Sequence, residues 1–172
     1  MPPPGLRELL EDIGDGENGY MGTPVPSGKM TLAAYLRQCV DLTDPAKVPA
    51  GLVPQTIFWV LDESGTAIGM VRMRHRLTEK LRTHGGHIGL YLRRDRRGRG
   101  LAKEILRLVL TELRKTGEPR ALLTIAENNL PSIRSVESAG GRLEDVRPDP
   151  ESGRMLRRYW IDLPPGPLSS SG

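Results

Sequence analysis

The sequence is poor in cysteine and in aromatic residues. Its single cysteine, Cys39, excludes an internal disulfide, so we expect a reducing compartment, by default the cytoplasm. Cys39 lies in an apolar helical pattern, which favours a small core side chain over a nucleophile. Aromatic residues make up only 4% of the chain, so the core must rest on leucine, isoleucine, valine and methionine.

Long apolar runs are also missing. No run approaches the roughly 20 residues that a membrane-spanning helix needs. Residues 1–5, Met-Pro-Pro-Pro-Gly, have neither the basic region nor the apolar run of a signal peptide. No cluster of histidine, cysteine and acidic residues has the spacing of a metal site. We therefore expect no membrane partner and no metal.

What is present suits one soluble globular domain. The 172 residues are 37% hydrophobic and 27% charged, with a net charge of +4. The distribution of charge matters more than its sum, because arginines crowd one short stretch: Arg93, Arg94, Arg96, Arg97 and Arg99. Such a cluster indicates an anionic partner without identifying it.

The apolar pattern predicts a mixed α/β domain without internal repeats. Helical spacing and turn residues predict helices at 6–13, 31–42, 101–115 and 131–139. Short β-rich runs predict strands at 57–61, 66–73, 87–92, 121–126, 142–146 and 155–163. We divide the chain into a loop-rich N-terminal segment (1–30), a main α/β domain (31–163) and a disordered tail (164–172).

The arginine-rich stretch has the setting of a phosphate site. A strand enters residues 90–102, a glycine-bearing loop turns, and the clearest helix of the chain leaves. The first turn of a helix has backbone N–H groups without intrahelical partners, and the helix dipole adds partial positive charge. Gly98 and Gly100 would let a phosphate approach the backbone, and Ala102 keeps the next position small.

The motif itself narrows the ligand. A P-loop needs Gly-Lys-Ser/Thr where this chain has Gly100-Leu101-Ala102, and a dinucleotide fingerprint needs a glycine where it has Lys103. What remains, Arg-x-x-Gly-x-Ala over residues 97–102, resembles the pyrophosphate-binding motif of the GNAT superfamily of N-acetyltransferases.

The context of the motif strengthens this resemblance. In that superfamily the helix is followed by a strand, an asparagine and a short helix that ends before glycine. Residues 128–141 resemble this segment, and these residues fall on its landmarks: Asn129, Ser132, Ile133 and Gly140. The resemblance covers roughly residues 57–163. It implies a GNAT fold, an α/β architecture with a central mixed, mostly antiparallel sheet flanked by helices.

The resemblance also implies a ligand and the residues that hold it. Acetyl-CoA would be the cosubstrate, and its acetyl group would pass to an amine. Three groups of residues would bind it: the amides of Arg97, Gly98, Arg99, Gly100, Leu101, Ala102 and Lys103 at the pyrophosphate, the strand edge of Leu90, Tyr91 and Leu92 along the pantetheine arm, and Asn129 and Ser132 nearby.

The catalytic groups are less marked. The tyrosine that protonates the departing thiolate in the superfamily falls on Val136, which cannot donate a proton. We rank His87 first as the general base, because it lies near where the superfamily's strand often carries a catalytic glutamate. His75 and Glu79 come next, and Tyr91 is the candidate proton donor to the thiolate. His84 we expect to be exposed.

Several alternatives stay open. Arg72, Arg74 and Arg76 alternate along a strand, where they would line a site for an acidic acceptor or form a solvated sheet face. Because of Val136, a CoA-binding sensor without activity is the first alternative to an enzyme. A nucleic-acid-binding module is disfavoured, because the arginine loop has no aromatic residue to stack on bases and no nucleic-acid-binding signature appears. The acceptor amine is unidentified, and a homodimer is compatible with the superfamily.

Overall fold

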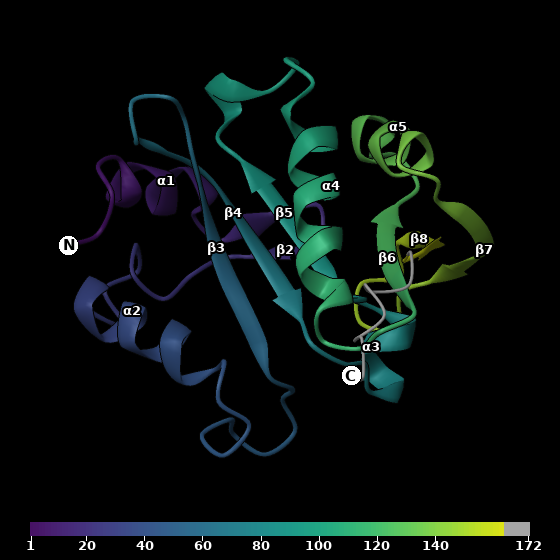
Figure 1. Ribbon diagram of the computed structural model, residues 1–172, viewed down its shortest axis with the longest axis horizontal. Coiled ribbons are helices and arrows are strands. Elements are labelled where there is room, and N and C mark those ends of the chain that lie inside the picture. Colours follow the sequence, from purple (N-terminus) through teal and green to yellow (C-terminus); the bar gives the residue numbers. More distant parts are fainter. Residues whose placement is uncertain (164–172) are drawn as a thin grey trace, which may run out of the picture.

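The computed structural model describes residues 1–163, and the predicted disordered tail lies outside them. Two three-stranded antiparallel sheets form the centre (Figure 1). The first has the order β3 (Gln55–Leu61), β4 (Ala67–Arg74), β5 (Ile88–Leu92), and the second β6 (Arg120–Ala126), β8 (Met155–Asp162), β7 (Arg142–Pro148). The six predicted strands are therefore confirmed, with ends shifted by one or two residues.

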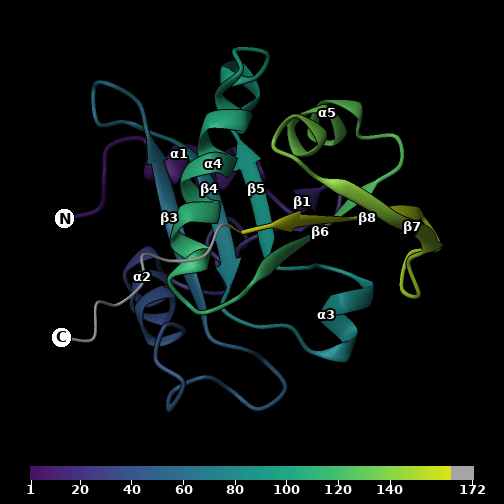
Figure 2. The same ribbon diagram turned by 45° about the vertical axis from the view of Figure 1, so that its right-hand side comes forward.

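Helices cover both faces of the first sheet (Figure 2). α4 (Leu101–Arg114) lies on one face, and α1 (Leu6–Ile13) and α2 (Leu32–Asp41) lie on the other. The remaining helices are α3 (Glu79–Thr83) and α5 (Leu130–Ser138), with a 3-10 turn at Arg94–Arg96. Four of these five helices match the predicted helices. The fifth, α3, lies in the stretch between the predicted strands 66–73 and 87–92.

Strand alternation in β4 explains how one sheet serves two cores. Val71 and Met73 point to the core shared with α4, whereas Met70 points to a second core under α1 and α2. Leu9 and Leu10 of α1 are fully buried in this second core. The proposed boundary at residue 30 stays a prediction, but α1 already packs on the sheet.

Residues 1–30 contribute no strand to the first sheet. Before α2, the structure has only the two-residue strands β1 (Gly16–Glu17) and β2 (Tyr20–Met21), which pair with each other. Within residues 1–163, β3 is therefore one edge strand of the first sheet, and β5 is the other.

Within residues 1–163, the two sheets are joined near the start of β5 and β6. The amide of His87 donates to Leu122 O (2.8 Å), and the amide of Leu122 donates to His87 Nδ1 (2.9 Å). Gly86 permits this approach: its φ is +60°, and a Cβ there would lie 2.3 Å from Leu122 O. Beyond this point the strands point the same way and diverge (Figure 2), so the sheet is split rather than continuous.

Candidate functional site

A cleft of about 1880 Å³ occupies the space between the diverging strands and continues onto the face covered by α2. Leu90 and Leu92 of β5 line one wall, and Leu123 and Ile125 of β6 line the other. No backbone hydrogen bond joins these stretches of the two strands in the described chain. The edge of β5 is thus available to an extended ligand that carries amide groups.

The N-terminus of α4 forms one end of this cleft. Gly98 and Gly100 have φ values of +75° and +73°, in the left-handed region that residues with a Cβ rarely adopt. No side chain caps the helix, and space is open around both glycines. The free N–H groups of the first turn and the helix dipole together suit a phosphate.

The residues predicted to bind the cofactor lie together. All of them line the cleft except Lys103, which lines a smaller neighbouring hollow next to Gly100. Asn129 precedes α5 and Ser132 lies in its first turn, so both reach the cleft from the β6 side. The structure therefore brings residues from β5, the loop, α4 and α5 to one site.

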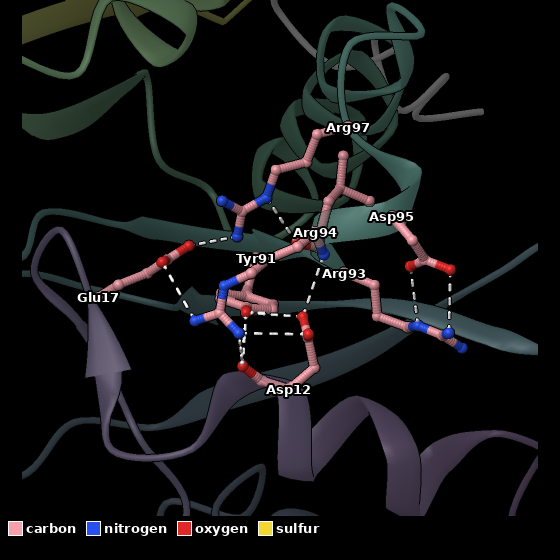
Figure 3. A network of polar contacts seen from close by, with 8 residues as sticks. Asp12, Glu17, Tyr91, Arg93, Arg94, Asp95 and Arg97 are labelled. Atoms are coloured by element: carbon pink, nitrogen blue, oxygen red, sulfur yellow. Dashed lines mark hydrogen bonds and ion pairs between the residues drawn. The ribbon is translucent and has the colours of Figure 1, made fainter.

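The arginine side chains of the loop are largely engaged within the protein (Figure 3). Arg94 pairs with Asp12 (3.3 Å) and Glu17 (3.4 Å). Arg97 also pairs with Glu17, and its Nε donates to Leu92 O (3.0 Å). These contacts attach the loop to α1 and β1, so the backbone of the loop, more than these side chains, faces a ligand.

Tyr91, the candidate proton donor, is held in the same network. Its ring is buried beneath the Arg97 guanidinium (5.1 Å to the ring centre). Its hydroxyl donates to Asp12, with 2.8 Å to both the backbone oxygen and Oδ2. Burial and then the bond to Asp12 raise the pKa of Tyr91 to about 12. This hydroxyl stabilises the attachment of α1.

His87, which we ranked first as general base, lies outside the cleft lining and is 1% exposed. Its Nδ1 accepts the Leu122 amide, and Nε2 lies 3.5 Å from Glu118 without a hydrogen bond. Burial, with the charges of Arg82 and Arg74, lowers the pKa of His87 to about 4. This geometry suits a side chain that joins the two sheets.

His75 and Glu79 also lie outside the cleft lining. His75 Nε2 is 2.7 Å from Thr56 Oγ1, and burial lowers the pKa of His75. Glu79 begins the short helix α3. The structure thus assembles the predicted cofactor residues but not the predicted bases.

A family model described as the acetyltransferase (GNAT) family matches residues 29–140. The chain belongs to the GNAT acetyltransferase family. The sequence resemblance is thereby confirmed, and with it the activity: this acetyltransferase uses acetyl-CoA as its acetyl donor. Among curated proteins, no match was found.

Solved structures share the fold at low sequence identity. A GNAT superfamily phosphinothricin acetyltransferase from Sinorhizobium meliloti in complex with acetyl-CoA is 17% identical, with 91% of this chain and 80% of that chain covered and a TM-score of 0.62. A mutant form of the spermidine N-acetyltransferase from Vibrio cholerae is 16% identical, with 63% and 66% covered and a TM-score of 0.52.

The residues that the structure describes include neither a metal-binding cluster nor a membrane-spanning helix. Residues 1–163 contain no group of three or more histidine, cysteine, aspartate or glutamate side chains that could hold a metal ion. None of their helices is both long and apolar enough to span a membrane.

His84, which we expected to be exposed, is instead partly buried and lines the cleft. His84 follows α3, its side chain is 28% exposed, and its Nδ1 lies 3.0 Å from Asp149 Oδ1. Asp149 also accepts from Ser152 Oγ (2.5 Å) and the Glu151 amide (3.1 Å), and these bonds, outweighing burial, hold its pKa below the usual value. An ionised carboxylate only accepts, so His84 Nδ1 carries the proton and Nε2 is free to take another.

Two arginines of β4 complete the cleft on the α2 side. Arg72 and Arg74 point to the same face of the sheet as Met70, opposite the face that packs on α4. Arg72 lies across from Gly89, where a Cβ would come within 3.3 Å of the Tyr20 ring. The absence of a side chain at Gly89 therefore leaves room for Tyr20 beside Arg72.

Proposed function

We propose that this acetyltransferase moves the acetyl group of acetyl-CoA to a primary amine of a small molecule or protein, by direct attack within a ternary complex. The observation that carries the proposal is the continuity of one cleft. It runs from the open N-terminus of α4, along the free edge of β5, to Arg72, Arg74 and His84. Donor and acceptor can therefore be bound at the same time.

The residues at the α4 end fit the donor. The amides of 97–103 provide donors for a pyrophosphate, and the edge of Leu90–Leu92 provides backbone partners for the pantetheine arm. Asn129 and Ser132 lie on the opposite wall. Acetyl-CoA supplies an activated thioester, so the protein must chiefly orient the amine, accept its proton and let the thiolate leave.

For the proton we propose His84 rather than His87, His75 or Glu79, because only His84 among them lines the cleft. The amine nitrogen bonds to the acetyl carbon, the carbon–sulfur bond breaks, and Nε2 of His84 takes the amine proton. Asp149 holds the imidazole in the required tautomer and stabilises its charged form. Val136 is buried at the position of the usual tyrosine, so no hydroxyl from that position protonates the thiolate.

The family assignment argues against the CoA-binding sensor without turnover that Val136 had left open, and acetylation of any amine would exclude it. The structural relatives do not choose an acceptor, because one is named for phosphinothricin and another for spermidine.

Substitution of Gly98 tests the donor site. Gly98→Val places a branched side chain at a φ of +75° beside the open N-terminus of α4. A ligand present at a hundred times its dissociation constant stabilises the fold by about 2.7 kcal/mol, which raises the melting temperature by about 5 to 10 °C for a domain of this size. We expect acetyl-CoA to produce this rise in the wild type and to lose it in the variant.

Gly28→Val is the matched control. Gly28 has a φ of +73°, open surroundings and a place outside the cleft, so it reports the cost of backbone strain alone. An unchanged acetyl-CoA response in Gly98→Val would refute this position of the donor.

A further inference from the structure

Two arginines in the cleft have no acidic partner. Among residues 1–163, neither Arg72 nor Arg74 forms an ion pair with a carboxylate. Arg74 uses Nη1 to bind Gly85 O (3.2 Å) and Gly86 O (3.1 Å). The Arg72 guanidinium lies over the Tyr20 ring, 5.4 Å from its centre. Both side chains are therefore positioned, but neither charge is neutralised by the protein.

Most acidic side chains on the cleft wall pair with other cations, and the exception, Asp15, forms no ion pair with Arg72 or Arg74 in the described chain. Glu17 pairs with Arg94 and Arg97, Glu151 with Lys80, and Asp149 with His84. Burial, and then the like charge of Arg72, lower the pKa of Arg74 to about 10. Two partly buried positive charges without a counter-charge are costly, and an anion from a ligand would offset that cost.

We propose that the acceptor is an amine that also carries an acid group, a carboxylate or a phosphonate, and that Arg72 and Arg74 bind this group. Guanidinium forks match the oxygens of both groups. The inference rests on the proposed function, because it treats this end of the cleft as the acceptor site. Arg74 binds the carbonyl of Gly85, the residue next to His84, so the acid group and the base are neighbours. The amine and the acid must then be only a few bonds apart, as in an amino acid, and a polycation such as spermidine is excluded.

The test is acetylation of matched acceptors, followed by release of the CoA thiol. The panel holds the common amino acids, the amines that remain when their carboxylates are removed, aminoalkylphosphonates and spermidine. We expect the best acceptor to carry an acid group and its kcat/KM to fall at least about 100-fold in the amine without it. Comparison of the amino acids with the phosphonates identifies which acid the arginines prefer.

The variant Arg72→Gln assigns the effect to this site. It should lower kcat/KM for the acid-bearing acceptor about 10- to 100-fold, mainly through KM, and leave the acetyl-CoA-dependent rise in melting temperature unchanged. Arg76→Gln is the matched control, since Arg76 is exposed, comes from the same stretch of chain and lies outside the cleft.

The outcomes separate this inference from the proposed function. Loss of the acetyl-CoA response in the wild type would count against the donor site and so against the proposed function. A normal response, with spermidine or the acid-free amines used as well as the acids, would overturn the inference alone. The inference would also be overturned if acetyl-CoA gave a normal response but no acid-bearing amine were acetylated. It would likewise be overturned if the Arg72→Gln enzyme kept the preference for acid-bearing acceptors.

Discussion

The two ends of the cleft use positive charge in opposite ways. At the α4 end, Arg94 and Arg97 are paired with Asp12 and Glu17, and the free backbone amides face the ligand. At the β4 end, Arg72 has no carboxylate partner within the described residues, and its charge is left for a ligand. The density of arginine along the sequence therefore marks the donor site, while the arginines free to select an acceptor lie elsewhere.

The difference has a physical basis. A pyrophosphate can be bound by fixed N–H groups and a helix dipole, which need no side-chain charge and do not depend on rotamers. The loop arginines can then hold α1 and β1 against the sheet. The acceptor end of the cleft has no such helix N-terminus, so side chains must recognise the acceptor. The charges of those side chains therefore have to remain unpaired within the protein.

The largest expected effect is at the acceptor end. His84→Gln removes the proposed base and should lower kcat by about 100- to 10,000-fold. The fall in rate on the acid side of the pH profile should disappear with it, which a purely structural role would not cause. Acetyl-CoA should still raise the melting temperature, because the α4 end is unchanged. The measurement is a pH profile of CoA release beside a thermal shift.

His75→Gln is the control for this change. His75 is a histidine of the same region with its Nε2 bound to Thr56, and it lies outside the cleft lining. We expect its kcat to stay within a few-fold of the wild-type value. A His84→Gln enzyme with normal kcat would exclude His84 as the base.

The next effect is on stability at the donor end. Asp12→Ala removes a carboxylate that accepts from the Tyr91 hydroxyl and the Arg94 amide (3.1 Å). We expect a loss of about 2 kcal/mol, or about 4 to 8 °C in melting temperature. Asp41→Ala, which breaks an exposed ion pair with Lys47 (2.9 Å), should lower the melting temperature much less.

The pH dependence of this loss checks its cause. Burial alone would raise the pKa of Asp12, but the bonds from Tyr91 and Arg94 outweigh it and the pKa is lowered from 3.8. A carboxyl with a lowered pKa in the folded state stabilises the protein fully above its unfolded value and loses this contribution as the pH falls through the folded value. The difference in melting temperature between wild type and Asp12→Ala should therefore persist at pH 7 and shrink below about pH 4. A constant difference would contradict an ionic origin.

The donor half could be predicted from sequence because its signals are local. A strand, two glycines and an amphipathic helix follow one another within residues 90–114, and backbone N–H groups do the binding, so side-chain contacts hardly matter. The split between β5 and β6 was not visible, because it depends on Gly86 meeting Leu122 across the fold.

The catalytic half could not be predicted, because it depends on distant partners. His87 was favoured by its place in a strand, yet its environment is set by Leu122, 35 residues away. The sequence predicts an exposed His84, yet Asp149, 65 residues away, orients its ring. The residues next to either histidine in the sequence do not indicate these contacts. The alternation of Arg72 and Arg74 along β4, in contrast, already indicated an acidic acceptor as one possibility.

The smallest expected effect concerns Glu17, which pairs with Arg94 and Arg97 of the loop before α4. Glu17→Gln should change the free energy of unfolding by less than about 1 kcal/mol, since Arg94 and Arg97 are well exposed. It also removes a negative charge beside the proposed pyrophosphate site and frees Arg97 from its ion pair. We therefore expect the dissociation constant of acetyl-CoA to fall a few-fold at low salt, and the difference to fade near 1 M salt, where charges are screened.

Glu8→Gln, the same change of charge on the exposed surface of α1, should leave the dissociation constant unaltered. Titration of both variants with acetyl-CoA at two salt concentrations decides the matter. Weaker binding by Glu17→Gln would mean that Glu17 holds the loop in its binding conformation, and the paired arginines would then belong to the donor site through their positions rather than their charges. In that case the α4 end would bind its ligand through a preorganised backbone, whereas the β4 end would bind its ligand through unpaired side-chain charge.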